Sequence, residues 1–307
     1  MTAPSLLLAA VLLSPVPEQA AASPGYLMWD AAELEERNDA LGERIGADGS
    51  ARETLADYET PAGSHRFRFI RRDSDGRPEQ HDEIDDVVLI QSGGGTILVG
   101  GEMLGRTGDL GTAIEGGTRH EVGAGDILRI PAGTPHAYLP VEGGHITYVL
   151  VRLPAFRGQV VANPDGEAPD LEPEGFALWP AAELGRRNAR LGERIGSDDS
   201  ARETLADFGP GGLSHRFRHI RRDGDGWPEL HPDIIDVVFV TSGAGTMHVG
   251  GDMVGQSNQP GSSINGGERH SVAAGDVLHI PARTPHAYLV PDGGHVTYVL
   301  VRFPAVD

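Results

Sequence analysis

The chain has 307 residues, of which 39% are hydrophobic, and a formal net charge of −20 at pH 7. Acidic residues outnumber basic residues by 45 to 25, so we expect neither nucleic acid nor an anionic membrane as a partner, because both attract proteins with excess positive charge. The sequence contains neither cysteine nor lysine, which excludes disulfides, thiolate metal ligands and Schiff-base chemistry.

The first residues have the pattern of a secretory signal. Residues 6–13 read LLLAAVLL and are followed by prolines and small residues. This apolar run is too short to span a bilayer, whereas an A-x-A-like site near Ala20–Ala22 is typical of signal cleavage. We therefore expect residues 1–25 to be a leader and the protein to be exported to the periplasm or the extracellular space. If the leader is instead an apolar tail, the protein stays in the cytoplasm.

The rest of the chain is an internal duplication. Residues 26–155 align with residues 176–305 without a gap, and LGERIG, ARETLAD and TPHAYL occur in both halves. The repeat is much longer than a solenoid unit, which indicates two copies of one domain. We predict domains at 26–155 and 176–307, joined by an acidic linker rich in proline and glycine at 156–175.

Each repeat is predicted to begin with a helix and to continue as strands. Asp30 can cap the first helix, Leu34, Leu41 and Ile45 form its apolar stripe, and Gly46 is expected to end it. Short β-branched runs separated by glycine follow, and they predict antiparallel strands in an all-β sandwich or barrel. The runs are residues 66–70, 87–90, 96–99, 126–130, 136–139 and 146–151.

Two motifs contain the candidate metal-ligating and catalytic residues. In the first repeat they are Glu79, His81, Asp86 and Gly93, spaced E-x-H-x4-D-x6-G, and Gly125, Pro131, Gly133 and His136, spaced G-x5-P-x-G-x2-H. The second repeat has, at the same spacings, Glu229, His231, Asp236, Gly243, Gly275, Pro281, Arg283 and His286.

This pair of motifs resembles the two conserved motifs of the cupin superfamily. The resemblance implies a double-stranded β-helix, or jelly-roll, barrel in each repeat, and hence a two-domain cupin, or bicupin. The match is closest in the second motif. In the first motif, glutamate stands where the family usually has its first histidine, and aspartate stands where it has glutamate.

The residue types suit a metal. Side chains alternate along a strand, so Glu79 and His81 can share a face, while Asp86 and His136 begin neighbouring strands. We expect these four, and in the second barrel Glu229, His231, Asp236 and His286, to converge on one point. Two imidazoles and two carboxylates fit one divalent ion of Fe, Mn, Ni or Zn per barrel, and no organic cofactor is expected. The alternative is a hydrogen-bonded polar network without metal.

Several roles remain open at this point. Glu79 and Glu229 are either ligands or free general bases. Tyr138 and Tyr288 share a strand face with the last predicted ligands, and the resemblance places His145 and His295 near the barrel mouth. All four side chains are candidates for lining the substrate pocket, and the other interpretation is a purely structural role in core packing. The four residues are Tyr138, His145, Tyr288 and His295.

We predict a bicupin metalloprotein that acts as a metal-dependent enzyme on a small organic molecule. An oxygenase is the first choice, and a lyase, isomerase or cyclase is a variant of it. The alternative function is a non-catalytic bicupin that binds or stores a small ligand. We expect a monomer whose two domains pair about a pseudo-twofold axis, with a dimer as the second possibility.

Overall fold

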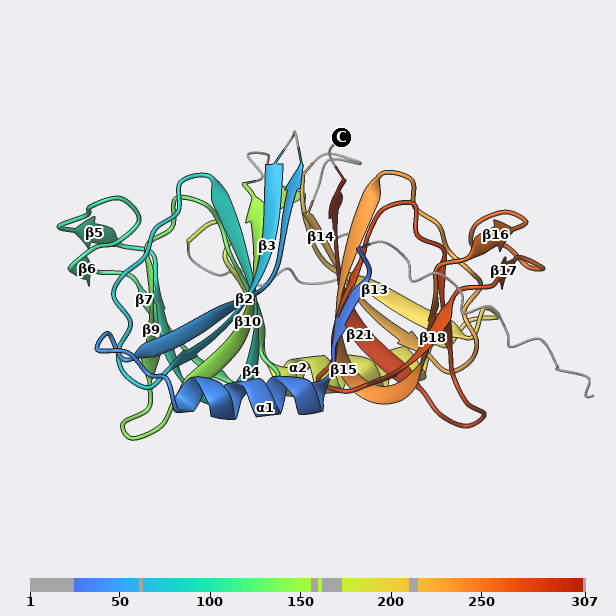
Figure 1. Ribbon diagram of the computed structural model, residues 1–307, viewed down its shortest axis with the longest axis horizontal. Helices are drawn as coiled ribbons and strands as arrows, with labels where there is room; N and C mark the ends of the chain where they lie inside the picture. Colours follow the sequence, from blue (N-terminus) through green and yellow to red (C-terminus); the bar gives the residue numbers. More distant parts are fainter. Residues whose placement is uncertain (1–24, 61–62, 156–159, 162–172, 210–214, 306–307) are drawn as a thin grey trace, which may run out of the picture.

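The structure is a computed structural model that describes residues 25–60, 63–155, 160–161, 173–209 and 215–305. The predicted leader up to residue 24 and most of the predicted linker lie outside these residues. Two β-rich halves stand side by side, and two helices run along one edge of the pair (Figure 1). In the part of the chain that is described, no helix is long and apolar enough to cross a membrane.

Helices α1 (Ala31–Gly42) and α2 (Ala181–Gly192) open the two repeats. Asp30 caps α1, since its side chain accepts a hydrogen bond of 2.8 Å from the backbone N–H of Glu33. The prediction that Gly46 ends this helix is wrong. The Arg44 N–H bonds back to the carbonyl of Leu41, which tightens the last turn, and the Gly46 N–H already bonds to Ser50 at the start of the next strand.

The strands form two large antiparallel sheets, which confirms the all-β prediction. The first contains, in spatial order, β12 (Ala177–Trp179), β8 (Ile127–Ile130), β4 (Ile84–Val99), β10 (Ile146–Pro154), β3 (Gly63–Arg72) and β2 (Ser50–Thr60), and β7 (Thr118–Gly123) and β9 (His136–Pro140) also pair with β4. The second contains β1 (Leu27–Trp29), β19 (Val277–Ile280), β15 (Ile234–Val249), β21 (Val296–Pro304), β14 (His215–Arg222), β13 (Ser200–Phe208) and β11 (Val160–Val161), and β18 (Glu268–Ala273) and β20 (His286–Leu289) also pair with β15. Two small hairpins complete the set, β5 (Glu102–Leu104) with β6 (Ala113–Glu115) and β16 (Asp252–Val254) with β17 (Ser263–Asn265).

Strand β4 forms the bend that shapes the first barrel. The runs 87–90 and 96–99, predicted as separate strands, belong to this one strand; its first half pairs with β8 and β10 and its second half with β7 and β9. The motif residue Gly93 lies at the bend with φ +73°. A Cβ there would lie 2.0 Å from the carbonyl oxygen of His145, so only glycine fits.

The two repeats exchange their first strands. β1 of the first repeat pairs with β19 of the second, and β12 of the second pairs with β8 of the first. Asp276 accepts a hydrogen bond from the Ala31 N–H, and Asp126 accepts the equivalent bond from Ala181. Backbone and side-chain hydrogen bonds therefore join the two halves directly.

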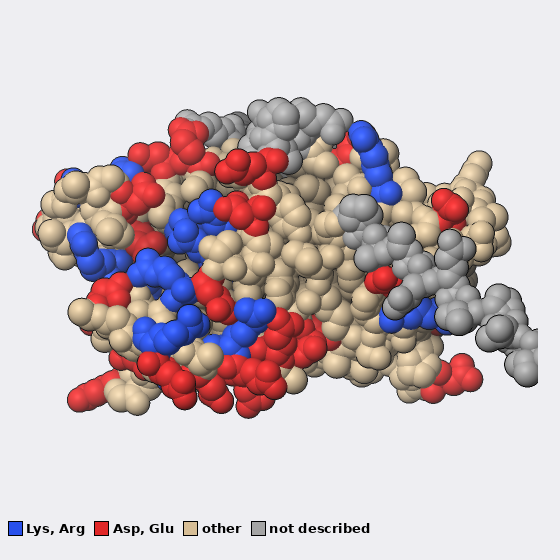
Figure 2. All heavy atoms as spheres, viewed as in Figure 1, with Lys and Arg blue, Asp and Glu red and all other residues tan. Residues whose placement is uncertain are grey.

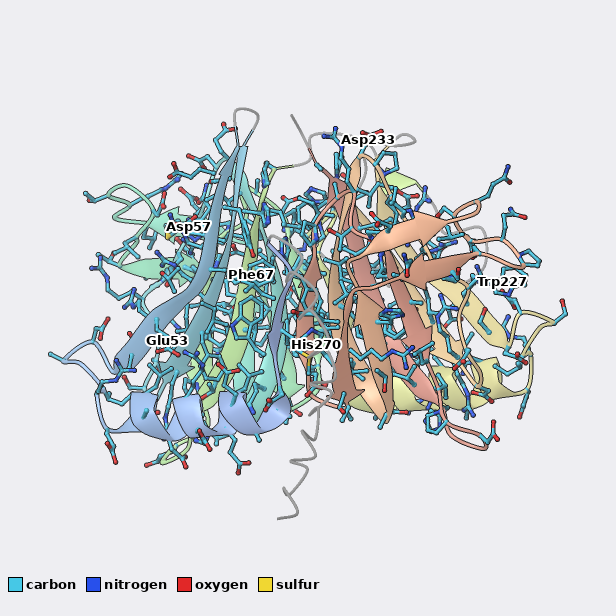
Figure 3. The ribbon with its side chains drawn as sticks, turned by 45° about the vertical axis from the view of Figure 1, so that its right-hand side comes forward. Glu53, Asp57, Phe67, Trp227, Asp233 and His270 are labelled. Atoms are coloured by element: carbon cyan, nitrogen blue, oxygen red, sulfur yellow. The ribbon has the colours of Figure 1, made fainter. Side chains whose placement is uncertain are left out.

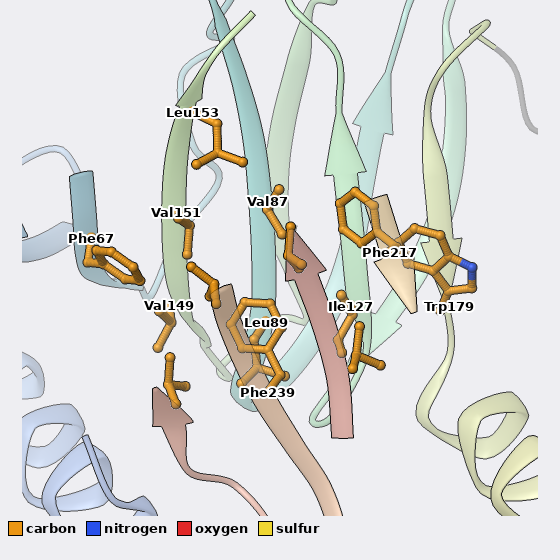
Figure 4. Packing of buried hydrophobic residues seen from close by; sticks show 14 of the residues in the cluster. Phe67, Val87, Leu89, Ile127, Val149, Val151, Leu153, Trp179, Phe217 and Phe239 are labelled. Atoms are coloured by element: carbon orange, nitrogen blue, oxygen red, sulfur yellow. The ribbon is translucent and has the colours of Figure 1, made fainter. Parts of the chain in front are cut away.

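A shared apolar layer lies between the sheets. Alternation along β4 directs Val87 and Leu89 toward the other repeat, whereas Val88 and Ile90 face the interior of their own barrel. Figure 4 shows this layer with residues of both repeats packed against each other. Figure 3 shows Phe67 on the side of the first half that faces the second, and its side chain is fully buried. Each barrel interior has a separate apolar cluster of its own.

Candidate metal centre

Each barrel contains a cluster of one glutamate and two histidines. In the first barrel, one donor atom each of Glu79, His81 and His136 lies within 4.8 Å of the others, and the second barrel repeats this with Glu229, His231 and His286. Contrary to the expectation of a shared strand, Glu79 lies in the loop after β3. It joins His136 through an isolated bridge, with backbone N–O distances of 2.8 and 2.9 Å.

The predicted aspartate lies beside both histidines in each barrel. Oδ2 of Asp86 is 3.8 Å from Nε2 of His81 and 3.7 Å from Nε2 of His136, and Oε2 of Glu79 is 3.5 Å from Nε2 of His81. In the second barrel the corresponding distances are 3.8, 3.8 and 3.1 Å. Two ligands of a tetrahedral ion with bonds of about 2.1 Å stand roughly 3.4 Å apart. The donor atoms are therefore spaced as metal ligands are.

The outer nitrogens of three imidazoles are held by acceptors. Nδ1 of His81 is 3.0 Å from a carboxylate oxygen of Asp109, and Nδ1 of His136 is 3.0 Å from the carbonyl of Thr134. Nδ1 of His286 is 2.9 Å from the carbonyl of Thr284. When Nδ1 carries the proton and donates it outward, the Nε2 lone pair faces the cluster, as in metal-binding histidines.

Burial and charge set the ionisation of the site. Burial lowers the pKa of His136 and of His286, which keeps both imidazoles neutral and able to bind a metal. Burial alone would raise the pKa of Glu79, but its hydrogen bond to His81 and the charge of Arg72 hold the pKa well below its ordinary value. Burial raises the pKa of Asp86, and one of its oxygens has no hydrogen-bond partner. A cation at the centre would relieve this carboxylate.

Sequence reasoning missed an arginine in each barrel. Nη2 of Arg152 lies 2.7 Å from Nε2 of His81, and Nη2 of Arg302 lies 2.7 Å from Nε2 of His231. Arg302 also lies 3.0 Å from Oδ1 of Asp236. Strand alternation could have found these arginines, because Arg152 shares a face of β10 with Tyr148 and Leu150, which line the barrel interior.

A second arginine anchors each glutamate. Nη2 of Arg72 lies 2.6 Å from Oε1 of Glu79, and its Nε donates to the Tyr148 hydroxyl at 3.0 Å. Arg222 repeats these contacts with Glu229 and Tyr298, at 2.9 and 3.0 Å. Glutamate is thus fixed on one side by arginine and presents its other oxygen to the histidines.

The four predicted pocket residues divide into two groups. Tyr138 and Tyr288 are buried in the barrel interiors, where their rings stack on Tyr148 and Tyr298 at centroid distances of 4.5 Å. Tyr288 lines the cavity beside the second cluster. His145 and His295 directly precede β10 and β21, and their side chains are hydrogen-bonded to Ser92 and Ser242. His295 is not among the described residues that line the cavity of the second barrel.

The loop of the second motif, which contains Gly133 in the first repeat and Arg283 in the second, also holds the histidine of the first motif in place. The Gly133 N–H donates to the carbonyl of His81, and Arg283 makes the same bond to His231, both at 2.7 Å. Gly133 has φ +78° and Arg283 φ +63°. The left-handed backbone that glycine adopts freely is therefore kept in the second repeat, where arginine replaces it.

Comparison with known proteins identifies the fold. No protein-family model matches the sequence, and no curated protein is similar to it. Salicylate 1,2-dioxygenase from Pseudaminobacter salicylatoxidans is similar in structure, with a TM-score of 0.60 at 12% identity over 93% of this chain and 86% of that one. A protein from Pseudomonas aeruginosa named as glyoxylate induced has a TM-score of 0.56 at 13% identity over 95% and 93%. Such identities show the fold alone.

Proposed function

The chain has the two-barrel cupin fold, and on that premise we propose that it is a metal-dependent enzyme acting on a small organic molecule. The observation that carries the proposal is the orientation of the imidazoles. In the first barrel both Nδ1 atoms are bound to outer acceptors, so both Nε2 atoms face each other and two carboxylates. An oxygenase reaction is the first to test, because a dioxygenase shares the fold.

The residues present fit a divalent ion of Fe, Mn, Ni or Zn. His81, His136, Glu79 and Asp86 would hold it in the first barrel through a mixed nitrogen and oxygen set. When bound, such an ion supplies Lewis acidity or a site for O2 activation. Arg72 fixes the glutamate, and Asp109 keeps the proton of His81 on Nδ1.

Glu79 also has a second role to offer. Its Oε1 is fixed by Arg72, while Oε2 faces the cluster at 3.5 Å from Nε2 of His81. If Glu79 is not a ligand, this oxygen is placed to accept a proton from a substrate at the centre. The low pKa of Glu79 favours the ligand role, because a strongly ionised carboxylate is a weak base and a good ligand.

A specific observation favours a second function, a non-catalytic ligand-binding bicupin. The guanidinium of Arg152 donates to the same lone pair of His81 that a metal would use. Each barrel also has two arginines close to its two carboxylates, so charge is balanced without an ion. In that case arginine, and not a metal, supplies the positive charge at the centre.

Metal analysis combined with oxygen uptake separates the two functions. Wild-type protein, loaded separately with Fe(II), Mn(II), Ni(II) and Zn(II) and then desalted, is compared with the double variant His136→Gln, His286→Gln. We expect one of these ions to remain in the wild type and to be lost in the variant, and a panel of small aromatic and aliphatic acids to reveal oxygen consumption that depends on it. Metal-free wild type after all four loadings would contradict the metal-dependent function and favour the ligand-binding one.

A further inference from the structure

The second barrel contains a cavity of about 80 Å³ next to its histidine cluster. Its wall includes four arginines but only two carboxylates; the charged residues are Arg202, Arg218, Arg222, Arg302, Glu229 and Asp236. Arg202 is ion-paired with Asp198, which lies outside this wall. The two carboxylates therefore face three further arginines, although the chain as a whole carries −20. On the face drawn in Figure 2, by contrast, acidic side chains gather along the edge that carries α1.

Arg218 is the arginine of this wall that forms no ion pair with any of the described residues. Alternation along β14 directs it to the same side as Ile220 and Arg222, and both of these face the barrel interior. Among the described residues, no carboxylate forms an ion pair with Arg218, and its Nε has no hydrogen-bond partner. A partly buried guanidinium keeps its charge, so what it lacks is an anion.

The residues around Arg218 also favour the binding of an anion. Burial and the positive charges of Arg302, Arg216 and Arg202 lower the pKa of Arg218, and the charge of Glu229 offsets this only in part. Strand pairing places Arg216 directly opposite Arg302, so Arg218 is the diagonal neighbour of Arg302 on the same face. The guanidinium of Arg302 already contacts Asp236, Glu229 and His231. Arg218 can therefore donate to a ligand carboxylate, and Arg302 adds positive charge beside it.

The first barrel offers an internal comparison. Its Arg68 corresponds to Arg218 and also lacks a hydrogen-bond partner at Nε. There, however, the carboxylate of Asp109 reaches over from the loop between β5 and β6 and bonds to His81. Gln259 stands at the corresponding position of the second repeat, without a charge. The His81 side chain is 5% exposed and that of His231 is 19% exposed, so the second site is the more open one.

We propose that the cavity of the second barrel binds a small organic carboxylate, held by Arg218 beside the positive charge of Arg302. The carboxylate is also the substrate class of the enzyme proposed above. Only its role as a substrate rests on that proposed function; its binding does not. Binding itself needs no metal, since the arginines supply the positive charge. The first barrel, with Asp109 over its cluster, binds such anions more weakly.

Isothermal titration of the full chain tests this proposal. The probes are malonate and benzoate, with malonamide and benzamide as neutral controls, added to protein freed of metal with a chelator. We expect at least one acid to bind and its amide not to bind. The variant Arg218→Gln should weaken binding at least about ten-fold, and the matched variant Arg68→Gln should leave it unchanged.

Three results would overturn the proposal. They are no binding of either acid to the wild type, undiminished binding to Arg218→Gln, or equal losses in Arg218→Gln and Arg68→Gln. The variant Arg218→Lys keeps the positive charge but loses the paired N–H donors of the guanidinium, so it should bind with intermediate affinity. It also keeps the proposal testable if the glutamine variant does not fold. Metal analysis of the same samples separates the two proposals, because acid binding without metal uptake contradicts only the metal-dependent function.

Discussion

Nη2 of Arg152 lies 2.7 Å from Nε2 of His81, the atom by which this histidine would bind a metal. Arg302 and His231 repeat the contact at the same distance in the second barrel. One lone pair cannot accept a hydrogen bond and bind an ion at the same time. The arginine and the metal therefore compete for the histidine, and the protein's metal affinity depends on how firmly the guanidinium is held.

Removing the competitor should strengthen metal binding. In Arg152→Gln, the lone pair of His81 is released and the carboxylates of Glu79 and Asp86 lose a cation, so the affinity of the first barrel for Zn²⁺ should rise about ten-fold or more. A competition titration with a chromophoric chelator measures this. The exposed Arg44 serves as the control position, and an affinity equal to that of the wild type would show that the arginine does not compete.

Asp109 should support metal binding without touching the metal. It holds Nδ1 of His81, and loss of such an outer partner costs about 10–100-fold in metal affinity. The variant Asp109→Gln copies the residue of the second repeat, so only the first barrel should weaken, and a two-site titration reads each barrel separately. Because the Asp109 side chain is 59% exposed, folding should be unaffected. A loss in both barrels, or in neither, would refute this role.

The apolar layer between the repeats should hold the two barrels together. Phe67 is fully buried there, so Phe67→Ala should lower the free energy of unfolding by about 3–5 kcal/mol. Urea denaturation followed by circular dichroism gives the value. The exposed Leu104 provides the comparison, since Leu104→Ala should change stability by less than about 0.5 kcal/mol. Similar effects of the two changes would place Phe67 outside the shared layer.

A histidine pair in the same layer should make stability depend on pH. Nε2 of His65 and Nε2 of His279 are 3.1 Å apart, and burial lowers their pKa values to about 4 and about 3. The unfolded chain, with histidine pKa values of about 6.5, therefore binds more protons than the folded chain as the pH falls below that value. The contribution of this pair to stability should be constant above about pH 6.5 and should decrease steadily toward pH 4.

The variant His279→Gln tests the source of this pH dependence. It removes one of the two buried groups, so the decrease in the free energy of unfolding between pH 6.5 and pH 4 should become smaller. In the pseudo-equivalent place, His215 lies 3.2 Å from Asp85, and Arg129 stands at the position of His279. His215 thus has a carboxylate beside it, whereas no ion pair joins His65 or His279 to a carboxylate among the described residues. An unchanged pH profile in His279→Gln would assign the effect to other groups.

The sequence analysis identified what depends on local pattern. The period of two along the strands and the glycines between them predicted a sandwich or barrel in each repeat. The jelly-roll barrel, and with it the expected convergence of Glu79, His81, Asp86 and His136, was implied by the resemblance of the two motifs to those of cupins. The bend at Gly93 was not predicted, because the runs 87–90 and 96–99 looked like separate strands; the pairing shows that β4 continues through Gly93 and changes partners there.

Other features depend on contacts between distant segments, which a local pattern does not contain. The exchange of β1 and β12 is set by which sheet edge each strand meets after the repeats have paired. The duplication itself gave no sign of it, because the similar segments LMW at 27–29 and ALW at 177–179 are compatible with either arrangement. Arg152 was missed for a different reason: an arginine near the end of a strand looks like a solvent-exposed residue until its face is established.

The most direct test of a metal in each barrel is anomalous X-ray diffraction from crystals of the full chain soaked in Mn²⁺. We predict one anomalous peak between Glu79, His81 and His136 and a second between Glu229, His231 and His286, with Arg152 and Arg302 moved away from Nε2. Crystals without either peak, in which both guanidinium groups still contact the imidazoles, would contradict the central claim and leave arginine as the cation of these barrels.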